Sequence, residues 1–359
     1  MTTPPTDHPD APGRVCPLRY HHGAAALAAA PLRPAQTLYV IGGLYGNTRA
    51  LATIEAMAAA EPGPVRCCFN GDFHWFDADP ARFDEIQRGV MRHDATLGNV
   101  EAELGHEGME AGCGCAYPAD VDDGTVTRSN RIHARLQATA RSRPGGQDPL
   151  PALQALPMFA RYQVGGARIG VVHGDADALA GWRFDGRTLA RRDRDECEWR
   201  ARAFDAAEVD LFASSHTCLP ALRAFDALGH PAAPGGAAAR RWVVNNGAAG
   251  LPDLRGDPAG LITRIGVQPF TGEVLAQWAL PVDGAAVWVA LLPVRHDAVA
   301  WQAEFLAQWP PGSDAHQSYF GRLSQGPALT RAQLFDPVIG PGDASAPQRN
   351  AGPALVQAD

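Results

Sequence analysis

Short apolar runs alternate with longer amphipathic stretches over most of the chain. Runs that predict β-strands lie at residues 38–41, 65–69, 162–164, 168–172, 211–213, 242–244, 262–267, 274–278 and 286–292. Stretches that are compatible with helices lie at 49–60, 80–92, 128–141, 192–207 and 296–309. Strands that alternate with helices of this length need crossover connections, so the pattern predicts an α/β fold with a mainly parallel sheet. Functional loops are then expected at the carboxyl ends of the strands.

The two ends of the chain differ in composition from the middle. Residues 1–14 are rich in Pro, Thr and Asp, and residues 339–359 are rich in Gly, Pro and Ala. Segments with so few large apolar groups do not offset the entropy lost on ordering, so we expect two disordered tails. Between them we expect one large domain over residues 15–283 and a C-terminal extension, residues 284–338, packed on its core.

Five polar motifs follow apolar runs along the chain. In order they are Gly42-Gly43-Leu44-Tyr45-Gly46-Asn47, Asn70-Gly71-Asp72, Gly98-Asn99-Val100-Glu101, Val171-Val172-His173-Gly174-Asp175 and Ser214-Ser215-His216-Thr217-Cys218. This order resembles that of the calcineurin-like metallophosphoesterase family, whose members carry Asp-x-His, Gly-Asp, Gly-Asn-His-Glu/Asp, a lone His and Gly-His-x-His. The resemblance covers residues 37–280 and implies a four-layer α/β/β/α sandwich with a metal centre at the strand ends.

The resemblance implies one retained half of a two-metal site. Asp72 matches the bridging carboxylate, and Asn99, His173 and His216 match the other ligands of the second ion. Imidazole, carboxylate and carbonyl groups of this kind suit a divalent ion such as Mn, Fe or Zn. The alternative is that Asp72 and Asn99 are turn or cap residues and that both histidines are satisfied core residues in a hydrogen-bond network.

The other half of the family's site is replaced. Gly43, Tyr45 and Cys218 stand where the family has the first ion's own ligands, and Val100 stands where it has the histidine that protonates the leaving group. Glycine offers no ligand, a phenol is a poor one, and only a cysteine thiolate could still bind a borderline metal ion. We therefore expect one conventional ion and no positioned general acid, a loss that costs about 10²- to 10⁴-fold in rate.

The cysteines offer a way to rebuild the lost half-site. Cys113 and Cys115 lie in a Gly-rich loop and Cys218 lies at the vacated position, so three thiolates could hold a zinc or iron ion, with His74 as a further ligand. The alternative is that these cysteines are small buried hydrophobic residues. The chain has seven cysteines, an odd number that does not describe a disulfide framework.

Two further side chains are candidates for contact with a substrate. Tyr45 follows the glycine turn, where its hydroxyl could reach a bound phosphate or its ring could fill the space as core. Arg128 lies near the start of a predicted helix, a position that suits a phosphate, although the sequence favours an ordinary capped and solvated helix start there.

The charge of the chain argues against two classes of partner. A net charge of −8 and a pI near 5.8 do not suit a surface that binds nucleic acid or anionic lipid. The Ala-rich stretch at residues 23–30 is too short to span a bilayer, so we expect no membrane contact and a cytoplasmic location. The sequence leaves open whether the protein forms oligomers.

The sequence therefore supports two functions. The first is a divergent metal-dependent phosphoesterase that hydrolyses a small phosphorylated or nucleotide substrate through the retained half-site. The second is a non-catalytic binding or regulatory protein on the same fold, which the loss of the first ion's ligands would explain. A redox or metal-storage role for the cysteines is a third reading. Retention of a complete half-site favours the enzyme, because random decay would have spoiled those ligands too.

Overall fold

The computed structural model describes residues 11–335 except 107, 109, 143–147, 234–235, 237–238 and 283–285. Most of the predicted N-terminal tail and all of the predicted C-terminal tail, residues 339–359, lie outside the described residues. Within the described ranges, no helix combines the length and the apolar character needed to cross a membrane.

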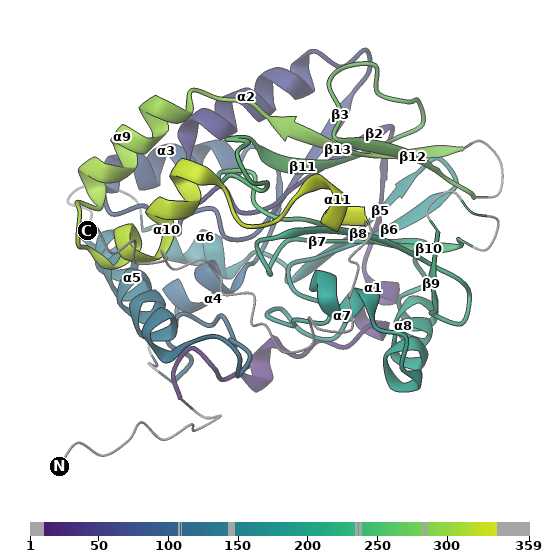
Figure 1. Ribbon diagram of the computed structural model, residues 1–359, viewed down its shortest axis with the longest axis horizontal. Coiled ribbons are helices and arrows are strands. Elements are labelled where there is room, and N and C mark those ends of the chain that lie inside the picture. The colour runs from purple at the N-terminus through teal and green to yellow at the C-terminus, as the bar shows by residue number, and fades with distance from the viewer. Residues whose placement is uncertain are drawn as a thin grey trace, which may run out of the picture.

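Two β-sheets lie face to face at the centre of the molecule (Figure 1). In the described part of the chain, one sheet has six strands, in the order β12 (Ala276–Leu280), β13 (Val287–Val294), β11 (Gly260–Gly266), β2 (Thr37–Ile41), β3 (Val65–Asn70) and β4 (Asp94–Thr96). The other has seven, in the order β1 (Leu32–Ala35), β5 (Phe159–Val164), β6 (Ala167–Val172), β7 (Leu211–Ser214), β10 (Arg241–Asn246), β8 (Pro220–Phe225) and β9 (Pro231–Ala232).

Helices cover the outer face of each sheet. Those that pack on the six-stranded sheet are α2 (Thr48–Ala59), α3 (Pro80–Val90), α5 (Asp123–Arg141), α9 (Ala298–Gln308) and α10 (Asp314–Gln325). Those on the seven-stranded sheet are α1 (Ala25–Ala29), α7 (Gly186–Ala190) and α8 (Arg194–Ala207). Shorter segments are η1 (Leu18–Tyr20), α4 (Asn99–Leu104), α6 (Leu150–Gln154) and α11 (Arg331–Phe335). This is the four-layer α/β/β/α sandwich, as the sequence predicted.

The apolar runs are continuous because the central strands are buried on both faces. In β2, Tyr39 and Ile41 pack against the helices, while Leu38 and Val40 pack between the two sheets. A strand that is buried on both faces needs apolar residues at every position rather than at alternate ones. This burial brings the polar residues that follow each strand to the edge where the two sheets meet.

The expectation of a mainly parallel sheet is wrong. Among the described strands five pairs are parallel, namely β2–β3, β3–β4, β6–β7, β7–β10 and β1–β5. Six other described pairs are antiparallel, namely β2–β11, β11–β13, β12–β13, β5–β6, β8–β10 and β8–β9. The connection from β5 to β6 is a tight turn at Gly165, whose φ of +54° suits glycine. A turn this short joins antiparallel neighbours and leaves no room for a crossover helix.

The C-terminal part of the chain is built into the same core. β13 lies between β11 and β12 inside the six-stranded sheet, so this part of the predicted extension is a sheet strand. Trp301 and Phe305 of α9 and Leu323 of α10 belong to the hydrophobic cluster on the outer face of that sheet. Helix α10 also packs on α5, which places it beside the loops that follow the strands.

Candidate metal centre

Four buried polar side chains meet where the two sheets come together. Asp72 follows β3 and Asn99 opens α4 just after β4, both from the six-stranded sheet. His173 follows β6 and His216 follows β7, both from the seven-stranded sheet. Each lies one to three residues beyond the last residue of its strand, at the carboxyl end, where loops carry functional side chains.

Asn70, the last residue of β3, links the two sheets beneath this cluster. Its Nδ2 donates to the backbone oxygen of Val172 at 2.8 Å and to Ser215 Oγ at 3.1 Å, both in the other sheet. Its Oδ1 accepts from Thr96 Oγ1 at 2.9 Å. In the sequence Asn70 is recognisable only as part of a motif. Its role as a link between the two sheets depends on contacts across more than 100 residues of chain, so the sequence did not predict it.

The ligand atoms of the four side chains converge on one point. His173 Nε2 lies 3.1 Å from Asn99 Oδ1, 3.2 Å from His216 Nδ1 and 3.4 Å from Asp72 Oδ1. The ligand atoms of Asp72, His173 and His216 all lie within 4.8 Å of one another. Over the residues that the structure describes, no other cluster of three or more His, Cys, Asp or Glu residues meets that spacing.

Backbone oxygens decide which nitrogen of each imidazole carries its hydrogen. His173 Nδ1 lies 2.8 Å from the backbone oxygen of Asn70, and His216 Nε2 lies 3.1 Å from that of Cys115. A carbonyl only accepts hydrogen bonds, so both of these nitrogens donate. When the rings are neutral, Nε2 of His173 and Nδ1 of His216 therefore turn two lone pairs toward each other.

The Asn99 amide also turns its acceptor atom toward the centre of the cluster. Its Nδ2 donates to the backbone oxygen of Cys113 at 2.9 Å, which leaves Oδ1 facing the two imidazoles. With neutral rings, the centre of the cluster therefore contains only hydrogen-bond acceptors. They are two imine nitrogens, an amide oxygen and the Asp72 carboxylate. Either a proton on one imidazole or a metal ion at the centre satisfies such a set, and a hydrogen bond from the second ring nitrogen to a carbonyl is typical of a metal-ligating histidine. The donor set therefore fits a divalent metal ion.

The charges in the cluster support a single cation site. Burial acts to raise the pKa of Asp72, but the neighbouring His173 and His216 outweigh it and lower that pKa. Burial acts to lower the pKa of His173, but Asp72 raises it overall, whereas burial and the charge of His173 lower the pKa of His216 to about 3. One proton on His173 thus balances Asp72, and a bound metal ion would take the place of that proton.

Glu101 holds Asp72 in a strained conformation. Asp72 has φ of +57°, a left-handed value that is uncommon outside glycine. The fully buried Glu101 carboxylate accepts the backbone N–H of Asp72 at 2.8 Å and that of Phe73 at 2.9 Å. Burial and the Asp72 charge raise the pKa of Glu101. Strain of this kind persists only where the surrounding structure enforces it, and it clusters at functional sites.

A tyrosine and a cysteine fill the space beside residue 43. Tyr45 Oη lies 2.6 Å from Cys218 Sγ, and a Cβ at Gly43 would lie 2.7 Å from Cε2 of the Tyr45 ring. Burial raises the pKa of Tyr45 well above its ordinary value and that of Cys218 to about 12, so both groups stay neutral. The Tyr45 hydroxyl is bonded to Cys218, and its ring occupies the room left by the missing side chain at Gly43.

The structure does not assemble the thiolate site. Cys218 Sγ bonds to Tyr45, while Cys115 Sγ donates to the backbone oxygen of Cys113 at 3.7 Å. The three cysteines form no metal-sized cluster with one another in the described part of the chain. They lie buried or half-buried, as free thiols.

His74 is engaged elsewhere through both ring nitrogens. Its Nδ1 bonds to Asp77 Oδ2 and its Nε2 to Gln87 Oε1, each at 2.8 Å. The ring stacks on Phe83 with a centroid separation of 3.8 Å. His74 therefore has no nitrogen left for a metal ion.

Arg128 lies behind the wall of the site. Its Nε donates to Ser318 Oγ at 2.7 Å and its Nη2 to Thr125 Oγ1 at 3.0 Å, which ties α5 to α10. Thr125 and Ser318 line the cavity, whereas Arg128 is not among the lining residues. Arg128 therefore supports the wall of the cavity through Thr125 and Ser318 and does not itself line the cavity.

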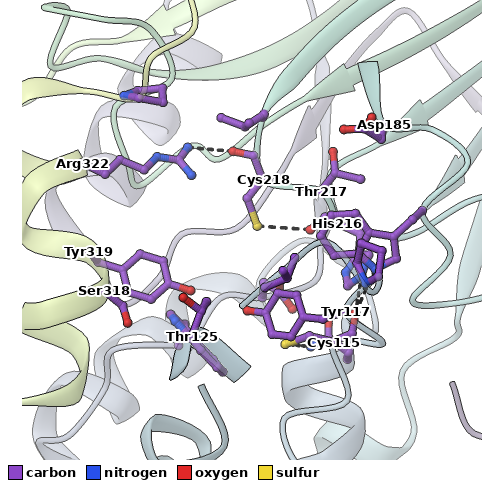
Figure 2. Close-up of a pocket in the computed structure, with 18 of the residues that line it drawn as sticks. Cys115, Tyr117, Thr125, Asp185, His216, Thr217, Cys218, Ser318, Tyr319 and Arg322 are labelled. Atoms are coloured by element: carbon purple, nitrogen blue, oxygen red, sulfur yellow. Dashed lines mark hydrogen bonds between the residues drawn. The ribbon is translucent and has the colours of Figure 1, made fainter. Parts of the chain in front are cut away.

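A cavity of about 310 Å³ opens over the cluster (Figure 2). Its aromatic lining consists of Tyr45, Trp75, Tyr117, Trp182 and Tyr319. Its charged lining consists of Asp72, Asp120, Asp185, Arg187 and Arg322. Val100 lines it as well, so the position of the family's histidine acid faces the cavity with an apolar side chain. The cavity is large enough for a small organic molecule.

Comparison with known proteins gives structural matches alone. No protein-family model matches the chain, and no curated protein matches it by sequence. The crystal structure of hypothetical protein PH1004 from Pyrococcus horikoshii OT3 matches with a TM-score of 0.51 at 14% identity, over 82% of this chain and 99% of that one. The metallophosphoesterase from Sphaerobacter thermophilus matches with a TM-score of 0.48 at 17% identity, over 81% and 99%. Likeness at such identity concerns the fold alone.

Proposed function

Because the chain has the calcineurin-like metallophosphoesterase fold, we propose that it binds one divalent metal ion and hydrolyses a small phosphate ester. The ligands are Asp72, Asn99, His173 and His216. The observation that carries the proposal is the convergence of their ligand atoms around His173 Nε2, with the hydrogens of both imidazoles turned outward to backbone oxygens. The ion is Mn, Fe or Zn, the metals that this donor set suits.

The side chains around the ion determine how a phosphoryl group is handled. When bound, the ion would supply Lewis-acid stabilisation of the charge on the phosphoryl oxygens. The buried ligands hold a fixed geometry, and the cavity above them leaves room for the substrate and for the water molecule that hydrolysis consumes. Val100 has no proton to give, so the substrate must carry a leaving group that departs as an anion. The proposal therefore favours aryl esters or phosphoanhydrides, including nucleotides, over simple alkyl phosphates.

A second function has its own supporting observation. The hydrogen-bonded pair of Tyr45 and Cys218 fills the first-ion position with neutral groups. A protein that only binds a phosphorylated molecule, or that regulates another protein, has no need of the second ion. On this alternative the retained cluster still holds a metal ion, but the loaded protein is inert toward phosphate esters.

Hydrolysis measured alongside metal content separates the two functions. We expect the protein loaded with Mn²⁺ to hydrolyse an aryl phosphate faster than an alkyl phosphate. Asp72→Asn and His173→Ala should abolish both metal binding and hydrolysis with the fold retained. His230→Ala, a surface histidine whose side chain is 51% exposed, is the matched control and should change neither. A metal-loaded protein without activity on any ester would support the binding protein, and unchanged metal content in both variants would refute the ligand assignment.

A further inference from the structure

A phosphoryl group at this centre faces a neutral wall on the side away from the ion. The hydrogen-bonded pair of Tyr45 and Cys218 stands there, with Tyr45 Oη 2.6 Å from Cys218 Sγ, and neither side chain is a cation. Phosphoryl groups are held and transferred most effectively where positive charge is arranged on more than one side of them. Positive charge must therefore come from another side chain of the cavity.

Among the described residues that line the cavity, two are arginines, Arg187 and Arg322. The Arg187 side chain is 43% exposed and its Nη1 lies 3.5 Å from Asp120 Oδ2. An ion pair this open to solvent is screened by water and salt. Nη2 of Arg187 is buried without a hydrogen-bond partner among the described residues, but the guanidinium is held by this open ion pair and is fixed less firmly than a fully buried one.

Arg322 of α10 is buried and held in place from one edge. Its Nε donates to the backbone oxygen of Pro252 at 2.9 Å. Its Nη2 donates to the backbone oxygen of Cys218 at 2.7 Å and to Asp253 Oδ1 at 2.9 Å. Within the described chain, Nη1 has no hydrogen-bond partner, although the whole residue is 91% buried, at 9% relative exposure. A guanidinium that is fixed through two nitrogens presents the third as a ready donor.

The position of Arg322 matches the side that lacks an ion. Arg322 Nη2 lies 2.7 Å from the backbone oxygen of Cys218, and Asp72, Cys218 and Arg322 all line the same cavity. Figure 2 shows Arg322 reaching the Cys218 backbone from the α10 side, while His216 lies on the other side of Cys218. The wall of this one cavity therefore carries, in order, the proposed metal ligand His216, the Cys218 thiol and the Arg322 guanidinium.

We propose that Arg322 binds an oxygen of the substrate's phosphoryl group through Nη1, supplying positive charge where the Tyr45–Cys218 pair has replaced the first ion. This rests on the proposed function, because the retained ion holds the other side of the same group. Guanidinium is well suited to this task, since it remains charged at all physiological pH values and bonds strongly to phosphate oxygens. The C-terminal helices then complete the binding site as well as cover the sheet.

The test uses the metal-loaded protein and inorganic phosphate as the probe, with phosphate affinity measured by calorimetry. Arg322→Met should weaken phosphate binding about ten- to a hundredfold, the range expected when a hydrogen bond to a charged group is lost, with one ion still bound. Arg322→Lys keeps a cation but has a single nitrogen for Cys218, Asp253 and phosphate together, so it should bind phosphate with intermediate affinity. Arg194→Met is the matched control, because Arg194 lies outside the cavity with its side chain 86% exposed, and it should bind phosphate nearly as well as the wild type.

A further variant separates recognition from structural support. Asp253→Asn removes the ion pair of Arg322 but keeps its guanidinium, so it should lower the midpoint of thermal unfolding and retain phosphate affinity. Unchanged phosphate affinity in Arg322→Met and Arg322→Lys, with metal content intact, would overturn the role of Arg322 alone. Equal losses in Arg194→Met and Arg322→Met would also overturn it, because they would indicate a general attraction between the protein's positive charge and phosphate. Absence of the ion from the wild-type protein would overturn the proposed function and this role together.

Discussion

Backbone carbonyl groups define the metal centre as much as the ligands do. The oxygens of Asn70 and Cys115 fix the hydrogens of His173 and His216 on their outer nitrogens, so the inner nitrogens are available to an ion. The sequence could not reveal these partners, because a carbonyl oxygen carries no residue-type signal. The four side chains that meet here were predictable from their types and their order along the chain.

The glycine at position 43 depends on the tyrosine at position 45. A Cβ at Gly43 would lie 2.7 Å from the Tyr45 ring, so Gly43→Asp alone should destabilise the protein by about 1–3 kcal/mol through overpacking. In the Tyr45→His background that clash is relieved, and the same Gly43→Asp change should cost less. Urea unfolding of the two single variants and the double variant measures this coupling. Equal costs in both backgrounds would mean that the Tyr45 ring does not fill the space beside residue 43.

At the scale of elements, the sequence predicted where most strands lie but not whether neighbouring strands pair parallel or antiparallel. Runs such as residues 65–69 and 211–213 are apolar because both faces of β3 and β7 are buried, and the structure confirms them as strands. β8 was missed because it contains a proline and Arg223, although all six of its residues are buried. Antiparallel pairing at β11 arises from contacts between distant segments, which local pattern does not encode.

One buried ion pair joins the end of α2 to the sheet. Glu61 accepts from Tyr39 Oη at 2.8 Å and from Arg264 Nη2 at 2.9 Å. Burial acts to raise the pKa of Glu61, but the hydrogen bonds from Arg264 and Tyr39 outweigh it and hold that pKa below its ordinary value. A lowered carboxyl pKa contributes stability above the ordinary glutamate pKa of about 4.3, and that stability is lost as the pH falls through the folded-state pKa.

We therefore expect Glu61→Gln to lower the free energy of unfolding by about 1–3 kcal/mol at neutral pH. The difference from the wild type should shrink as the pH falls below about 4, because the wild-type carboxylate becomes protonated as well. Urea unfolding at several pH values measures it. Glu198→Gln is the control, because Glu198 is 46% exposed and its pairing with Arg194 is worth little. A difference that stays constant down to acid pH would argue against the pairing of Glu61.

At the scale of the whole molecule, the site lies at the junction of three parts of the chain. Each sheet supplies two ligands, and α10 supplies Tyr319 and Arg322 to the cavity above them. A metal ion at the junction would bind the folded chain and not the unfolded one. Ligand binding of this kind stabilises the folded state by about 2.7 kcal/mol at a hundred times the dissociation constant.

The midpoint of thermal unfolding should consequently rise when Mn²⁺ or Zn²⁺ is added and fall when a chelator removes it. His173→Ala should lose this response, because one of the two imidazoles that face the ion is missing. Cys115→Ser should keep it, because the Cys115 contact to His216 is made by the backbone oxygen. A metal response of equal size in His173→Ala would place the bound ion elsewhere in the molecule.

The most direct test of the central claim is elemental analysis of the protein purified without chelator or added metal, with Cys218→Ser analysed in parallel. We expect one divalent ion per chain in both proteins, because Cys218 Sγ is bonded to Tyr45 and Gly43 offers no ligand, so the first-ion position lacks a set of ligands. Two ions in the wild type and one in Cys218→Ser would contradict it and restore the thiolate site. No metal in either protein would contradict the metal centre itself.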